Sequence, residues 1–127
     1  MKIRVQDVDK RAAGYFVHFS CLYGSGQAAW HGPVPDIGRE YCVDIECGEL
    51  VIWGETVYPV KSRMCRMRSS RDCLRITGLL VLMNRDGTAA LRLCNDLVIL
   101  KVKGTPPSPD TYVEFRACDV ILRAAGL

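Results

Sequence analysis

The sequence predicts an all-β fold, a small closed or partly open barrel of OB-like type formed by a single domain over residues 1–127. Seven or eight short segments alternate apolar and polar residues and are separated by turn residues, with almost no helical periodicity. Many short strands with regular turns are typical of a sandwich or barrel. At 127 residues, the chain is long enough for one core that buries roughly two-thirds of the unfolded surface.

The strongest local signal is a hairpin over residues 73–103, with its turn at residues 84–87. Asp86-Gly87 between two apolar runs indicates a tight turn, because glycine readily adopts a positive φ. After the turn we expect a strand that bends or bulges near residues 95–96 and then continues. In the first strand, one face would carry Leu74, Ile76, Leu80 and Leu82, and the other Leu79 and Val81.

The N-terminal part predicts a hairpin added to this barrel. Residues 1–8 and 15–23 alternate apolar and polar side chains and read as two strands. We expect a flexible turn at residues 24–26, where two glycines flank a serine, and a short returning strand at 27–30.

The middle of the chain begins with the longest early strand, residues 39–53. Its alternation slips at Cys47-Gly48, which predicts a bulge that bends the strand. Residues 57–60 would add a short edge strand. Residues 61–72 show no β character and predict either one helical turn or a mobile loop.

The C-terminal part predicts a proline-stiffened linker at residues 104–110 and a last strand at 112–123. In that strand the alternation again shifts phase, which indicates a second bulge.

The seven cysteines form no C-x-x-C pair. The chain starts with charged residues too soon for a secretory signal and has no apolar run long enough for a transmembrane helix. We therefore expect a cytoplasmic protein whose cysteines are reduced and pack as small apolar side chains. Cys42 and Cys47 would point to opposite faces of their strand, and no metal site is predicted.

The net charge of +3 is unevenly distributed. The basic segment, residues 61–75, has six basic residues and one acidic residue, and this net charge of +5 leaves −2 for the rest of the chain. Three interpretations stay open: a solvated loop, phosphate contacts on nucleic acid, or docking to an acidic protein surface. The basic residues are Lys61, Arg63, Arg66, Arg68, Arg71 and Arg75.

No catalytic signature is present. Neither of the two histidines, His18 and His31, lies in a recognisable nucleophile motif, and there is no phosphate-binding loop. Asp44 and Glu46 share a strand face about 7 Å apart, which is typical of a solvated face. The sequence therefore predicts that the protein is not an enzyme, and it implies no cofactor.

Aromatic residues beside loops offer anchors for a protein contact. They are Trp30, Trp53 and Tyr58, with His31 next to the first. The alternative is that the two tryptophans close the ends of the barrel.

Residues 39–123 resemble the five-stranded OB-type barrel in the order of their strands. They also resemble it in the spacing of a glycine, an Asp-Gly turn and a Leu-Arg-Leu motif between Gly78 and Leu93. This resemblance implies nucleic-acid binding as one function. Such barrels use exposed aromatic rings as stacking platforms, and residues 73–103 contain no aromatic residue.

The chain also resembles short, stand-alone bacterial proteins of the toxin-immunity type. The matching stretches are AAWHGPVPDIGREYCVDIE, ELVIWGETVYP, DGTAALRLCNDLVIL and GTPPSPDTYVEF. The resemblance implies a toxin domain as partner. Since this chain is net basic, the toxin would present an acidic patch, or the contact would lie away from residues 61–75.

Our functional prediction is a non-catalytic protein-binding module, and more narrowly an immunity protein that neutralises a toxin, with no membrane association. The alternative is a nucleic-acid-binding domain that uses the basic segment. The predicted binding residues are Arg63, Arg66, Arg68, Arg71, Trp30, His31, Trp53 and Tyr58.

Overall fold

The computed structural model describes residues 1–71, 73–108 and 110–124, and in these ranges it contains strands and no helix. No helix in this part of the chain is therefore long and apolar enough to cross a membrane. The first six strands are β1 (Lys2–Arg11), β2 (Gly14–Cys21), β3 (Gly24–His31), β4 (Glu40–Cys47), β5 (Leu50–Ile52) and β6 (Val57–Pro59). The other six are β7 (Arg66–Ser70), β8 (Cys73–Met83), β9 (Thr88–Leu93), β10 (Asp96–Lys103), β11 (Tyr112–Ala117) and β12 (Val120–Ala124).

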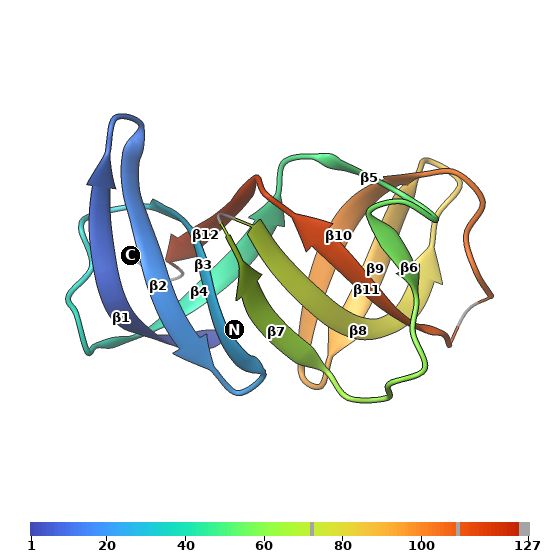
Figure 1. Ribbon diagram of the computed structural model, residues 1–127, viewed down its shortest axis with the longest axis horizontal. Coiled ribbons are helices and arrows are strands. Elements are labelled where there is room, and N and C mark those ends of the chain that lie inside the picture. The colour runs from blue at the N-terminus through green and yellow to red at the C-terminus, as the bar shows by residue number, and fades with distance from the viewer. Residues whose placement is uncertain (72, 109, 125–127) are drawn as a thin grey trace.

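Five strands close a barrel, which confirms the predicted fold class. β1, β2 and β3 form an antiparallel meander, and β12 pairs in parallel with β3. β4 completes the ring because it is antiparallel to both β12 and β1. Figure 1 shows this barrel at the left, with the blue β1–β2 hairpin next to β3, β4 and the red β12. The N-terminal strands thus belong to the barrel that closes, and residues 39–123 do not form it alone.

The remaining strands lie beside this barrel (Figure 1). β8, β9 and β10 form a second antiparallel meander, and β5 is parallel to β10. β11 pairs with β8 on one side and β6 on the other. A bridge between Trp53 and Val57 links the β5 end of this series to β6. β7 joins the two sets, because it pairs along β8 and touches β3 at Gly24.

The alternation in the sequence explains the core. Ile3 and Val5 of β1, like Val17 and Phe19 of β2, are buried at every second position. The second set contributes its own inward rows, including Phe115 of β11. The buried side chains of both sets form one continuous cluster.

The predicted single strand over residues 39–53 is wrong. The chain leaves β4 at Gly48 and starts β5 at Leu50, so the two halves belong to different strand sets. The backbone N–H of Gly48 donates a 2.8 Å hydrogen bond to the carbonyl of Asp119. A Cβ at this glycine would lie 2.4 Å from the Asp119 carboxylate, so a larger residue at the crossing of the two connections would require this side chain to shift.

Two predicted loops are strands. Residues 61–72 include β7, whose Met67 is fully buried and pairs with Ile76 of β8. Residues 24–26 begin β3 and form no turn. The space for a side chain is missing there, since a Cβ on Gly26 would lie 2.4 Å from the Leu74 side chain. These glycines allow neighbouring strands to approach closely. Composition alone does not distinguish a glycine in this role from a glycine in a turn.

The predicted continuation of a bent strand past residues 95–96 is also wrong. The chain reverses there, with Cys94 at a φ of 51°, and β10 returns antiparallel to β9. On β8 a register shift between Leu80 and Leu82 turns Leu82 out of the core, so that it is exposed although we predicted it beside Leu80.

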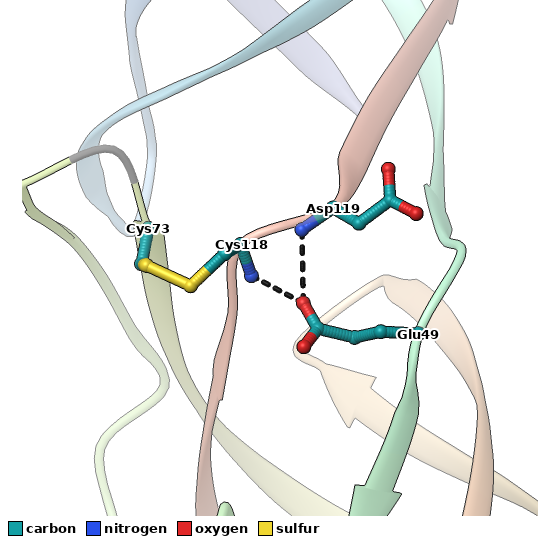
Figure 2. Close-up of a disulfide and its surroundings, with 4 residues drawn as sticks. All are labelled: Glu49, Cys73, Cys118 and Asp119. Carbon is teal, nitrogen blue, oxygen red and sulfur yellow. Dashed lines mark hydrogen bonds between the residues drawn. A yellow bond between two sulfur atoms is a disulfide. The ribbon is translucent and has the colours of Figure 1, made fainter.

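The expectation of reduced cysteines is wrong for Cys73 and Cys118, which form a disulfide (Figure 2). They lie 45 residues apart in sequence, and their Cα atoms are 4.0 Å apart because β8 and β11 are paired neighbours. The free cysteines are Cys21, Cys42, Cys47, Cys65 and Cys94.

Candidate binding surface

Four arginines meet on the outer face of the sheet that β7, β8 and β11 form. Cross-strand pairing places Arg68 opposite Arg75 and Arg75 opposite Arg116, so three guanidinium groups share one row. Arg66 lies two residues before Arg68 on the same side of β7. We refer to Arg66, Arg68, Arg75 and Arg116 as the arginine face.

Glu114 occupies the centre of the neighbouring row. Its side chain is only 13% exposed, and its Oε1 lies 3.5 Å from Nη2 of Arg68. Its Oε2 lies 3.8 Å from Nη1 of Arg75 and accepts a 2.5 Å hydrogen bond from the hydroxyl of Tyr58 on β6. One carboxylate therefore faces two of the four arginines, Arg68 and Arg75.

The positive charge of the arginine face is not fully compensated. Arg66 and Arg116 are exposed, and within the described residues neither forms an ion pair. The Nε of Arg75 is buried and lacks a hydrogen-bond acceptor in this part of the chain. Like charges directly opposite each other weaken strand pairing. An anionic group from outside would remove this repulsion.

Tyr58 is held in its protonated form. The hydrogen bond that its hydroxyl donates to Glu114, followed by partial burial, raises the pKa of Tyr58 above its ordinary value. The phenol therefore remains a donor, and it keeps one carboxylate oxygen of Glu114 occupied.

An exposed apolar patch lies on the same outer surface, farther along β8. It consists of Leu82, Leu97 and Ile99, each 51–61% exposed. Leu82 and Ile99 lie on either side of Ala90 in one row, and Leu97 lies in the next row opposite Arg92. Since Arg92 pairs with Leu79 of β8, the surface is continuous from the arginine face to the apolar patch.

The structure brings together three of the predicted binding residues, Arg66, Arg68 and Tyr58. Arg71 lies in the turn that follows β7, with a φ of 58°. Arg63 lies in the preceding loop and lines a shallow cavity with Asp110 and Tyr112.

The two predicted tryptophan anchors and His31 lie elsewhere. Trp30 and Trp53 are 6% and 8% exposed, which fits the alternative interpretation of barrel-closing rings better than that of contact anchors. The indole N–H of Trp30 donates a 2.7 Å hydrogen bond to the carbonyl of Pro33. His31 is exposed at the end of β3 in the closed barrel.

Sequence reasoning missed Glu114 and Arg116 as members of the site. Both belong to the polar side of the alternating strand β11. They lie about 40 residues beyond the basic segment, so only the pairing of β8 with β11 associates them with it.

Other ion pairs lie away from this surface. Nε of Arg123 lies 2.6 Å from Oε1 of Glu46, and Nε2 of His18 lies 3.7 Å from Oδ2 of Asp9. Among the residues that the structure describes, no three histidine, cysteine or acidic side chains are grouped so that they could hold a metal ion.

The fold and this surface define a small all-β protein with a basic and apolar outer sheet face. Comparison of the chain with protein-family models, with curated proteins and with solved structures finds no match in any of the three.

Proposed function

We propose that this protein is a non-catalytic module that binds another protein through the arginine face and the apolar patch. The observation that supports this most directly is their continuity on one sheet surface, across Leu79 and Arg92. Exposed apolar side chains next to arginine are characteristic of protein interfaces, where arginine is enriched and often contributes strongly to binding.

The chemistry of the surface supports one kind of partner. Leu82, Leu97 and Ile99 suit an apolar counterpart, while Arg66 and Arg116, which form no ion pair within the described residues, suit carboxylates. Arginine is suited to this role because its planar guanidinium group can donate two parallel hydrogen bonds to a carboxylate. The partner is therefore a protein with a small apolar area bordered by acidic side chains.

The narrower form of the proposal is an immunity protein that neutralises a toxin. It rests on the resemblance of the chain to short bacterial proteins of that type, and it requires a toxin domain with an acidic patch. A non-catalytic inhibitor needs only a complementary surface, and the arginine face with the apolar patch offers one.

Nucleic-acid binding is the second proposal, because four arginines on one sheet face would also contact phosphates. Two features favour protein over nucleic acid. The carboxylate of Glu114 lies among the arginines, and the patch beside them is aliphatic, whereas single strands stack on aromatic rings.

Affinity capture with the tagged protein from its native cells tests the proposal, at 50 and 300 mM salt with nuclease added. We expect a stoichiometric protein partner at 300 mM that is lost with Arg116→Glu and with Leu97→Asp. Lys10→Glu changes the charge equally on the exposed end of β1 and should retain the partner. Partner binding unaffected by both face variants would refute the proposal. Nucleic acid recovered at 50 mM, and lost with nuclease, would support the alternative.

A further inference from the structure

The disulfide between Cys73 and Cys118 continues the rows of the arginine face. Cys73 lies two residues before Arg75 on β8, and Cys118 lies two residues after Arg116, just beyond the end of β11. Between them is one pair of the ladder, Leu74 and Ala117. The disulfide therefore joins the two strands directly beyond the row in which Arg75 and Arg116 oppose each other.

At this row, strand pairing works against electrostatic repulsion. Arg116 has no ion pair in the described structure, and Glu114 reaches only Arg68 and Arg75. The ladder ends at Ala117, so beyond it the disulfide joins the ends of β8 and β11 to each other directly, where pairing of the two strands has stopped. The disulfide holds two like charges side by side at the end of a ladder.

The same disulfide lies at the crossing between the two strand sets (Figure 2). The backbone N–H groups of Cys118 and Asp119 both donate hydrogen bonds to Oε1 of Glu49, and the second bond is 2.9 Å long. Glu49 itself lies in the connection from β4 to β5. The end of β11 is thus held on one side by Glu49 and on the other by Cys73.

A reductant can reach this bond. Cys118 is exposed and Cys73 is half-buried, whereas a structural disulfide deep in a core is shielded. The β8–β11 ladder has six residue pairs, and β11 is also paired with β6. Loss of the covalent link therefore affects the end of the ladder first.

We propose that the Cys73–Cys118 disulfide is a redox switch that orders the arginine face for binding in its oxidised form and loosens it when reduced. This regulation rests on the function proposed above. The physical basis is preorganisation, because guanidinium groups fixed in one row bind carboxylates without a further entropic cost of ordering.

The reduction consumes one dithiol. A thiolate of the dithiol attacks the sulfur of Cys118, forms a mixed disulfide and releases Cys73 as a thiolate. The second thiol of the reductant then displaces Cys118 and closes a cyclic disulfide. Two electrons pass from the dithiol to the protein, and its two thiol protons end on the two cysteines.

Amide hydrogen exchange, measured with and without dithiothreitol, tests the proposal that reduction loosens the paired strands. We expect reduction to accelerate exchange of the amides at residues 74–76 and 115–117 by about tenfold or more. The amides of β1 and β2 should not change, and Cys42→Ser should respond like the wild-type protein. The double variant Cys73→Ser with Cys118→Ser should exchange rapidly with or without dithiothreitol. Unchanged exchange, or equal acceleration in β1 and β2 through global unfolding, would overturn the switch.

Binding of poly-L-glutamate tests the proposal that the disulfide controls binding. This acidic probe has no apolar side chains, so it reports on the arginine face and not on the apolar patch. We expect the oxidised protein to bind this probe at least about threefold more tightly than the reduced protein. Arg116→Gln should weaken binding by the oxidised form and reduce the difference. If accelerated exchange accompanies equal affinity, the switch does not act on binding and is overturned. If the oxidised protein does not bind at all, the proposed function fails while the exchange result still reports on the loosening of the strands.

Discussion

The hydroxyl of Tyr58 donates a hydrogen bond of 2.5 Å to the Glu114 carboxylate, the same group that faces Arg68 and Arg75. The two residues are directly opposite each other on β6 and β11. This bond fixes the orientation of the carboxylate, so that its other oxygen is directed at Arg68. The charge balance of the arginine face therefore depends on a neutral side chain from a three-residue strand.

Replacement of Tyr58 by phenylalanine should lower the free energy of unfolding by about 1–2 kcal/mol at pH 7, because a hydrogen bond to a carboxylate is lost. Urea unfolding measures the change. Tyr15→Phe is the matched control, since the Tyr15 hydroxyl makes no hydrogen bond in the described structure. A Tyr58 variant as stable as the Tyr15 variant would show that the bond is energetically unimportant.

Stability should fall as the pH rises above about 10, the ordinary pKa of tyrosine. The pKa of Tyr58 is raised in the folded protein, so the unfolded chain releases this proton first and unfolding becomes more favourable. The pKa of Tyr23 is also raised, mainly by burial, and contributes in the same direction. Urea midpoints between pH 8 and 10.5 should decrease less steeply for Tyr58→Phe than for the wild-type protein. Equal slopes would contradict the assignment.

Tyr23→Phe should destabilise the protein by about 1–3 kcal/mol. The hydroxyl of Tyr23, in the turn between β2 and β3, donates to the carbonyl of Leu93 at 2.5 Å and lies 2.7 Å from Oδ2 of Asp96. It therefore links the closed barrel to the β9–β10 turn, and its loss leaves a buried acceptor unpaired. Thermal unfolding followed by circular dichroism would detect the change, and a melting temperature within error of wild type would exclude a stabilising role.

Glu49→Ala should lower stability by about 1–3 kcal/mol, because the backbone N–H groups of Cys118 and Asp119 lose their shared acceptor. Glu55→Ala is the control, since this exposed side chain makes no hydrogen bond or ion pair in the described ranges. The difference in unfolding free energy between the two variants, measured by urea unfolding, isolates the contribution of the Glu49 hydrogen bonds to stability. If both variants lose the same stability, Glu49 does not hold the end of β11.

Substitution of serine for both Cys73 and Cys118 should reduce the free energy of unfolding by about 4 kcal/mol, according to the chain-entropy estimate for a loop closed across 45 residues. Equilibrium unfolding of the wild-type protein with and without dithiothreitol should give a similar difference. Double substitution of Cys42 and Cys94, both exposed and free, should leave stability nearly unchanged. A wild-type protein equally stable in both conditions would show that the disulfide contributes little.

Local alternation predicted most strands well, because the two-residue period of a strand is visible in any window of a few residues. Ile3 with Val5 and Val17 with Phe19 are buried as their spacing indicated. Cys42 and Cys47 likewise lie on opposite faces of β4, where alternate positions differ in exposure. Boundaries were less certain, since glycine serves both turns and close strand contacts, as at Gly26.

The binding surface could be predicted only in part. The sequence identified Arg66, Arg68 and Tyr58, because basic and aromatic residues stand out by type. It did not identify Glu114, Arg116 or the exposure of Leu97, since these depend on which strands are neighbours and on where the chain reverses. The exposure of Leu82 depends on a register shift that no local pattern reveals.

By itself, the sequence determined that the chain forms short strands around an apolar core and carries one strongly basic segment. These properties follow from side-chain alternation, turn residues and charge, all of which act over a few residues. Only the tertiary structure decided that β12 closes the barrel with β3 and β4, that Arg75 faces Arg116, and that Cys73 meets Cys118. Such pairings join segments tens of residues apart, and they are selected by the packing of the whole chain rather than by any segment alone.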